Sequence, residues 1–127
     1  MKIIKEKEED NLLFVLKSDN GEEISQARVD FVNFNENQRK RLDFPMEGDV
    51  CYIHSFMTIR SMRNQGYGRK LMQHLLDSIK GHFAYLIVCS IGEMSNDQLV
   101  EYYKSFGFEE HYKKDCYKDL PWLVINK

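Results

Sequence analysis

The 127-residue sequence contains only three cysteines and two prolines, and it has no excess of charge of either sign. Cys51, Cys89 and Cys116 are odd in number and widely spaced, which fits neither a disulfide framework nor a paired metal clamp. The 18 basic and 20 acidic residues give a formal charge of −2, which provides no electrostatic footprint for nucleic acid or an anionic membrane. We therefore expect a reduced protein without a nucleic-acid or membrane partner.

Long apolar runs and targeting signals are also missing. The first ten residues become acidic where a secretory signal would become hydrophobic, and no apolar run approaches the roughly 20 residues of a membrane span. The four histidines are dispersed without metal-ligand spacing, so we predict no metal site. These absences together predict a cytoplasmic protein.

The length and composition suit one globular domain. The chain is 43% apolar and 30% charged, and a chain of this size can bury a core without help from metals or disulfides. No repeat or Pro/Gly/Ser linker divides it. We therefore treat residues 1–127 as a single domain, with N-terminal strands and a loop over 1–49 and a core over 50–127.

The N-terminal part is predicted to form an antiparallel β-meander. The apolar run 12–17 and the alternating residues 27–31 flank Asp19-Asn20-Gly21, which is a tight-turn signal. Ile3 and Ile4 indicate a further strand. The polar stretch 35–49 is predicted to be a loop that borders a surface site.

From Val50 onward the pattern becomes α/β. A strand, a helix and a second buried strand follow one another, which predicts a parallel pair with a right-handed crossover. Ser95 to Gln98 fits a capping box at the start of a second helix, and Gly107 ends it. In chain order, the expected elements are a strand over 50–59, a helix over 67–80, a strand over 85–89, a helix over 96–106 and strands over 108–112 and 122–126.

The segment Arg63 to Arg69 (RNQGYGR) lies between a buried strand and the first helix. Gly66 and Gly68 allow backbone N–H groups to converge, and the first helical turn adds the positive end of its dipole. Arg63 and Arg69 bracket the turn with charge, which favours a pyrophosphate ligand. The alternative is that the glycines only permit a tight connection between two solvated arginines. The segment is neither a Walker loop nor a dinucleotide fingerprint, because their further glycine, lysine and acidic positions are missing.

Two motifs at once resemble one known family. The stretch 63–68 (RNQGYG) resembles the [RQ]-x-x-G-x-[GA] loop of the GCN5-related N-acetyltransferases, the GNAT superfamily. The stretch 96–108 (NDQLVEYYKSFGF) is similar to the family's second signature, Asn-x-x-Ala-x-x-x-Tyr-x-x-x-Gly-Phe. The resemblance covers Val50 to about Asn126, and the first fifty residues carry none of its motifs.

The resemblance implies a mixed, mostly antiparallel sheet in which a central parallel strand pair splays into a V that holds acetyl-coenzyme A. It implies that the amides of Gln65, Gly66 and Gly68 hold the pyrophosphate and that main-chain groups near Phe56 to Thr58 pair with the pantetheine arm. The residues that it assigns to the cosubstrate are Phe56, Met57, Thr58, Arg63, Asn64, Gln65, Gly66, Tyr67, Gly68, Arg69, Asn96 and Tyr103.

The resemblance also implies direct transfer of the acetyl group to a primary amine, with Tyr103 as the general acid that protonates the departing thiolate. Helical spacing alone allows Tyr103 to be an ordinary aromatic of a buried stripe. Neighbouring Tyr102 is the second candidate. We expect no acyl-cysteine intermediate at Cys89, because direct transfer needs no nucleophile.

An ammonium acceptor must lose a proton, which at pH 7 costs roughly 4 to 5 kcal/mol for a lysine-like amine. Protein-lysine acetyltransferases of this family carry a glutamate where this chain has Tyr52. Period-two alternation predicts that Tyr52, His54, Phe56 and Thr58 share one strand face, so His54 is the candidate general base. Tyr52, Glu47 or water are the other candidates for the general base. The alternative for His54 is that it is only a hydrogen-bonded residue of the core.

The acceptor and the partners stay open. Typical family members have one or two helices after the first strand that flank the acceptor site, whereas this chain has strand and turn signals there. A peptide, protein or small-molecule amine is compatible with the sequence, and the closing strands are a candidate homodimer surface. The alternative functions are a non-catalytic acyl-CoA-binding regulatory module and a phosphate-dependent interaction domain.

Overall fold

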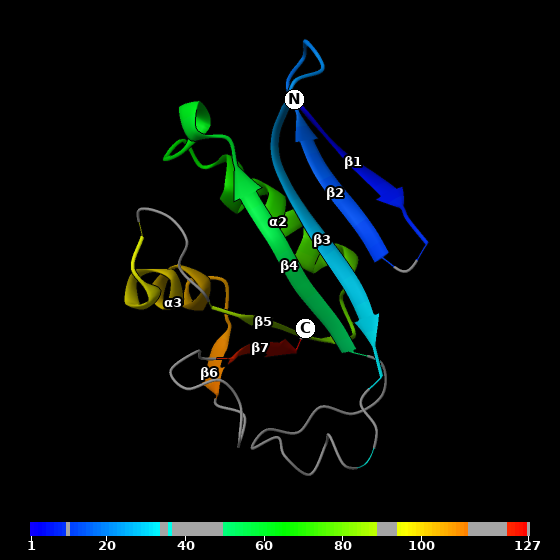
Figure 1. Cartoon of the computed structure of the whole chain (residues 1–127), viewed down its shortest axis with the longest axis vertical. Helices are drawn as coiled ribbons and strands as arrows, with labels where there is room; N and C mark the ends of the chain where they lie inside the picture. Colours follow the sequence, from blue (N-terminus) through cyan, green and yellow to red (C-terminus); the bar gives the residue numbers. More distant parts are fainter. Residues whose placement is uncertain (10, 34–35, 37–49, 89–93, 112–121, 127) are drawn as a thin grey trace.

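A computed structural model describes residues 1–9, 11–33, 36, 50–88, 94–111 and 122–126 (Figure 1). The described residues form a seven-stranded sheet in the order β1-β2-β3-β4-β5-β7-β6. The strands are β1 (Lys2–Lys7), β2 (Asn11–Lys17), β3 (Glu23–Val32), β4 (Val50–Thr58), β5 (Phe83–Ile87), β6 (Glu109–His111) and β7 (Trp122–Asn126). The helices are the 3₁₀ helix η1 (Arg60–Met62) and the α-helices α2 (Tyr67–Ser78) and α3 (Asn96–Lys104).

The N-terminal meander is confirmed. Strands β1 to β4 pair antiparallel in sequence order, and Gly21 takes the left-handed φ of 84° in the turn between β2 and β3. Glycine occupies this conformation without the steric penalty of a Cβ atom. Apart from Glu36, the predicted loop over 35–49 lies outside the described residues.

The central parallel pair is also confirmed. Helix α2 connects β4 to β5, and these two strands are parallel, whereas β5 pairs antiparallel with β7 and β7 with β6. The sheet is therefore mixed and mostly antiparallel, as expected. The described helices include none that is long and apolar enough to cross a bilayer.

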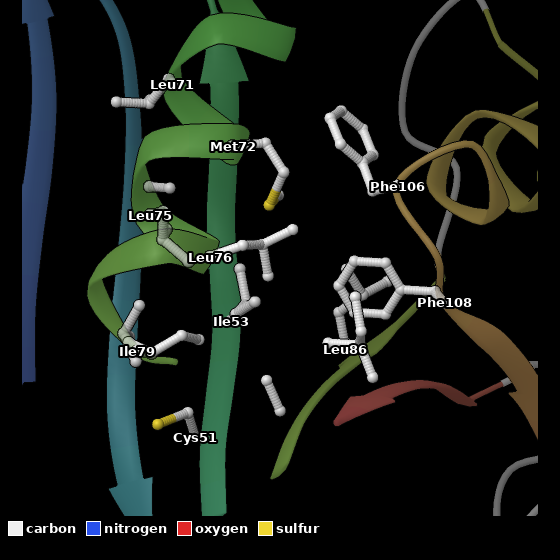
Figure 2. Close-up of a cluster of buried hydrophobic side chains, with 14 of the residues drawn as sticks. Cys51, Ile53, Leu71, Met72, Leu75, Leu76, Ile79, Leu86, Phe106 and Phe108 are labelled. Atoms are coloured by element: carbon white, nitrogen blue, oxygen red, sulfur yellow. The ribbon is translucent and has the colours of Figure 1, made fainter. Parts of the chain in front are cut away.

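The main core lies between the sheet and its two helices. Leu71, Met72, Leu75 and Leu76 of α2 are at most 2% exposed because they recur at helical spacing along the face that lies on the sheet. Figure 2 shows these side chains between α2 and the sheet, with contributions from β4, β5 and the end of α3. Burial of each such leucine contributes roughly 1.5–3 kcal/mol, so this layer fixes α2 on the sheet.

Both ends of α3 can be explained by local hydrogen bonds. The predicted capping box is present: Ser95 Oγ accepts from the Gln98 N–H at 3.2 Å, and Gln98 Oε1 accepts from the Ser95 N–H at 2.8 Å. The helix ends at Lys104 rather than at residue 106, because the Phe106 N–H bonds to the Tyr103 carbonyl at 3.0 Å and tightens the last turn. Gly107, with φ of 106°, then terminates the segment as predicted.

Candidate active site

Strands β4 and β5 separate after a short paired stretch, and we call this point the fork. The pairing comprises Val50 with Phe83, Cys51 with Ala84 and Tyr52 with Tyr85. Beyond Tyr52, β4 continues to Thr58 while remaining paired with β3. The backbone edge of β4 that would face β5 is therefore not used by the parallel ladder over Ile53 to Thr58. In the part of the chain that the structure describes, no strand pairs with this edge beyond Tyr52, so the edge is suited to an added strand-like partner.

A β-bulge at Ser55 reverses the side-chain alternation of β4. The pairs Gln26–Met57 and Arg28–His54 are two residues apart on β3 but three residues apart on β4. Ser55 has a φ of 54°, which is in the left-handed region that non-glycine residues seldom adopt. One extra residue on β4 shifts the period of two by one position.

The bulge overturns the prediction that Tyr52, His54, Phe56 and Thr58 share one face. Phe56 packs against the core on the α2 side, where Cys51 and Ile53 also lie, whereas Tyr52 packs in the cluster of the opposite face. His54 stacks on Tyr52 with ring centroids 5.1 Å apart, so it too belongs to the opposite face. The candidate base therefore lies across the sheet from the side chains of Phe56 and Thr58.

The turn before α2 has the features expected of an anion cradle. Gly66 is the N-cap with φ of 83°, no side chain caps the helix and no acidic residue occupies its first turn. The first helical bond runs from the Lys70 N–H to the Gly66 carbonyl at 3.0 Å, so the amides of the three preceding residues lie before the helical ladder. These amides and the positive end of the helix dipole favour an anion at this point.

Gly68 lets this helix end approach β4. A Cβ atom at this position would lie 3.1 Å from Thr58 Oγ1 and 3.3 Å from Phe56 Cζ, which is closer than ordinary van der Waals contact. The close packing against the end of β4 therefore favours glycine as the second glycine of the motif. The contact sets the first turn of α2 directly beside the part of β4 that has left β5.

The two arginines of the loop have different surroundings. Arg63 Nε donates to the Thr58 carbonyl at 3.0 Å and joins the loop to the end of β4. The Arg69 guanidinium instead lies over the ring of Phe106, 4.6 Å from its centroid, and donates to Ser105 Oγ at 3.0 Å. The expectation that both arginines bracket the cradle is therefore wrong for the Arg69 side chain, which links α2 to the end of α3.

Gly66 and Gly81 provide a matched pair for testing the cradle. Both have left-handed φ values, 83° and 97°, and a Cβ at either position would meet nothing within 4 Å. We expect Gly66→Ala and Gly81→Ala each to cost about 1–2 kcal/mol of stability through backbone strain. Only Gly66→Ala should weaken coenzyme A binding, by about tenfold, because it disturbs the turn that presents the amides. Thermal denaturation and calorimetric titration of both variants check this, and equal affinities would contradict it.

Tyr103 faces the core and the part of β4 beyond the bulge. Its ring centroid lies 6.3 Å from that of Phe56 and 6.1 Å from that of Phe108. Burial, with a further contribution from Tyr102, raises the pKa of the Tyr103 phenol to about 12. The phenol is therefore protonated at physiological pH and is able to donate a proton.

Tyr102 has a different environment on the same helix. The Arg69 guanidinium lies 5.4 Å from its ring centroid, and the ring packs edge-on against Phe106. Burial raises the pKa of Tyr102, and the Arg69 charge opposes that shift. Of the two candidate acids, Tyr103 is the one whose ring packs near that of Phe56 on β4. Asn96, the other residue of the second motif, occupies the first turn of α3.

On the opposite face of the sheet, aromatic rings form a stacked row across three strands. Trp122, Tyr85, Tyr52 and His54 stack in that order, with centroid separations of 4.7, 4.9 and 5.1 Å. Burial and then the Asp30 carboxylate raise the pKa of Tyr52. Tyr52 is therefore a poorer candidate than His54 for accepting a proton at neutral pH.

His54 contacts two residues that the sequence did not single out. Its Nδ1 lies 3.0 Å from Ser55 Oγ, and its Nε2 lies 3.0 Å from Asp30 Oδ1, without the alignment of a full hydrogen bond. No sequence signal distinguishes Asp30, which comes from β3 far earlier in the chain. Glu47 and Cys89, the other residues considered for the chemistry, lie outside the described residues. Within the described ranges, no three His, Cys, Asp or Glu side chains gather as a metal site.

Comparisons with known proteins identify the family of the chain. The model of the acetyltransferase (GNAT) family matches residues 2–108, and the chain belongs to this family. The match includes the N-terminal strands, in which the sequence shows no family motif. No curated protein matches the chain.

Solved structures of acetyltransferases share the fold. Bacillus subtilis N-acetyltransferase YlbP in complex with coenzyme A is 13% identical, with a TM-score of 0.66, and the alignment covers 91% of this chain and 67% of that chain. Arabidopsis thaliana NAA60 in complex with a bisubstrate analogue is 17% identical, with a TM-score of 0.66 and coverages of 91% and 75%. Arabidopsis thaliana Naa50 in complex with the bisubstrate analogue CoA-Ac-MVNAL is 18% identical, with a TM-score of 0.62 and coverages of 91% and 72%.

Proposed function

We propose that the chain transfers an acetyl group from acetyl-CoA to a primary amine. Membership of the GNAT acetyltransferase family supports the reaction class. The observation that carries the proposal is the convergence of three features along the part of β4 that has left β5: the edge that the described strands leave unpaired, the first turn of α2 beside Thr58, and the Tyr103 ring against Phe56. Each feature serves a different part of an acyl thioester.

The diphosphate of the cosubstrate binds at the first turn of α2. The amides of Tyr67, Gly68 and Arg69 and the turn residues Asn64 to Gly66 surround it, and Arg63 adds positive charge. The pantetheine arm pairs with the main chain of residues 56–58 along the β4 edge that β5 does not occupy. This pairing directs the thioester toward the fork. The absence of a first-turn carboxylate on α2 favours this binding, because a carboxylate there would repel the diphosphate.

At the fork, the amine attacks the thioester carbonyl and a main-chain N–H of β4 stabilises the negative charge that develops on oxygen. Tyr103 gives its proton to the sulfur as the C–S bond breaks, so that a thiol leaves instead of a thiolate. His54 receives the proton that the amine loses. No covalent enzyme intermediate is required.

The acceptor is a primary amine of a peptide or a small molecule. Two similar structures contain bisubstrate analogues, one of which carries the sequence MVNAL, and this supports testing peptide amines first. The partly exposed Asp30 carboxylate beside His54 favours an approaching ammonium group.

Acetyl-CoA labelled in its acetyl group tests the proposal against peptides, amino acids, polyamines and cell extract. We expect labelled amide to form in proportion to released thiol. Binding of coenzyme A without transfer to any acceptor would favour the alternative of a regulatory acyl-CoA-binding module. Stabilisation by inorganic pyrophosphate but not by coenzyme A would favour a phosphate-dependent interaction domain.

A further inference from the structure

Three polar side chains form a continuous row from β3 to the bulge of β4. The Asp30 carboxylate lies 3.0 Å from His54 Nε2, and His54 Nδ1 lies 3.0 Å from Ser55 Oγ. Asp30 and His54 are partly buried, with 37% and 26% of their side chains exposed, and Ser55 is exposed. The row therefore begins at a carboxylate on the sheet face and ends at an accessible hydroxyl.

The bulge is what joins His54 to Ser55. In a regular strand, consecutive side chains point to opposite faces and do not meet. The φ of 54° at Ser55 interrupts this alternation and allows its hydroxyl to reach the imidazole of the preceding residue. A serine in this conformation costs of order 1–2 kcal/mol relative to glycine. Backbone strain of this kind is concentrated at functional sites, so the Ser55 hydroxyl is a candidate functional group.

Ser55 also lies on the part of β4 that has left β5. It is three residues beyond Tyr52, which is the last residue of β4 to pair with β5. The diverging part of β4 is the part that the proposed function assigns to the thioester. Ser55 is thus the member of the row nearest, along the strand, to the reacting groups.

We propose that Ser55 is a further catalytic residue that carries the amine proton to His54, and that Asp30 is a positioning residue for this relay. The inference rests on the proposed function. Before the C–N bond forms, an N–H bond of the ammonium breaks and its proton passes to Ser55 Oγ, while the Ser55 hydroxyl proton passes to His54 Nδ1; the free amine then attacks. The imidazolium later releases its proton to solvent, and the serine ends unchanged.

The charges around His54 suit this direction of transfer. The carboxylate of Asp30 beside Nε2 favours the tautomer that carries its proton there, which leaves Nδ1 as the acceptor for Ser55. Once Nδ1 is protonated, Asp30 stabilises the imidazolium. Among the described residues, Arg28 is the cation on β3 paired with His54, but its guanidinium lies 3.5 Å from the Glu8 carboxylate. Tyr52 contributes a neutral ring to the stack.

Ser55→Gly tests the relay without endangering the fold, because glycine adopts the left-handed conformation freely and preserves the bulge. We expect kcat at pH 7 to fall about 100-fold, which is the lower range for loss of general-base assistance, with an unchanged KM for acetyl-CoA. Asp30→Asn should lower kcat about tenfold. Ser61→Ala, at an exposed serine of η1, is the matched control and should retain full activity.

The dependence of these losses on pH separates a relay from a structural role. A lysine-like acceptor becomes free amine as the pH approaches about 10.4, and a free amine needs no group to remove its first proton. The deficits of Ser55→Gly and Asp30→Asn should therefore shrink as the pH is raised from 7 to about 10. A structural defect would give the same deficit at every pH.

Three results would overturn the relay: full activity of Ser55→Gly, a deficit that does not change with pH, or a stable acetyl adduct on Ser55 detected by intact mass after incubation with acetyl-CoA. A stable acetyl adduct would show that Ser55 acts as a nucleophile and not as a proton carrier. In each of these cases an active wild-type enzyme leaves the proposed function standing. A wild-type chain that binds no acetyl-CoA would contradict both the relay and the proposed function.

Discussion

Replacing Tyr103 by phenylalanine is expected to lower kcat at least about 100-fold while leaving KM nearly unchanged, because the variant keeps the packing ring and loses the proton donor. The ring contacts with Phe56 and Phe108 do not involve the hydroxyl, so the fold should be retained. Steady-state kinetics with a saturating amine measure this loss. Normal turnover would remove Tyr103 as the acid.

Tyr102→Phe is the matched control for this variant. Tyr102 is the preceding residue of α3, and its described ring contacts are with Arg69, Phe106 and Tyr103. We expect its kcat to change less than about threefold. Because burial raises the pKa of Tyr103 to about 12, the phenol stays protonated below about pH 11, and the loss in Tyr103→Phe should be constant between about pH 6 and pH 9.

Replacing Gly68 by valine should abolish measurable coenzyme A binding, which corresponds to a loss of affinity of at least about 100-fold. The new side chain would overlap Thr58 Oγ1 and Phe56, which lie 3.1 and 3.3 Å from a Cβ at this position. Relief of the overlap, at a cost of roughly 1–3 kcal/mol, moves the first turn of α2 away from β4. Calorimetric titration measures the affinity, and circular dichroism verifies that the variant is folded.

A second variant separates this effect from general instability. In Gly68→Ala, helix propensity favours alanine by about 1 kcal/mol, so any loss of affinity must come from the contact with β4. We expect about a tenfold loss, which Thr58→Ala should restore in the double variant by removing the nearer atom. Ser25 Oγ would still donate to the Met57 carbonyl at 2.9 Å and hold the end of β4. Failure of the double variant to recover would contradict the proposed contact.

The sequence was sufficient for most of the fold because the local signals agree with the tertiary arrangement. The alternating and apolar runs predicted each strand, and the capping box and Gly107 bounded α3. The parallel pair followed from strand, helix and strand order, since a crossover helix joins parallel neighbours. From Val50 onward the remaining differences at helix and strand ends are one or two residues, where a final 3₁₀-type turn or sheet pairing decides the boundary, whereas β3 begins four residues before the predicted alternation.

The candidate site was less accessible to sequence reasoning. The bulge at Ser55 depends on how β4 pairs with β3, and no pattern in VCYIHSFMT marks the extra residue. A period-two count therefore assigned His54 to the wrong face relative to Phe56. The direction of the Arg69 side chain depends on the rings of α3, which lie more than thirty residues away in the chain. Motif spacing located the turn before α2 but not the side chains that lie around His54.

The most direct test of the central claim is a calorimetric titration of the wild-type chain with coenzyme A and with acetyl-CoA. We predict saturable binding of one molecule per chain for both ligands, loss of binding in Gly68→Val and retention of binding in Gly81→Ala. A wild-type chain that releases no heat with either ligand, and whose melting temperature neither ligand raises, would contradict the assignment of the α2 turn and the β4 edge to an acyl thioester.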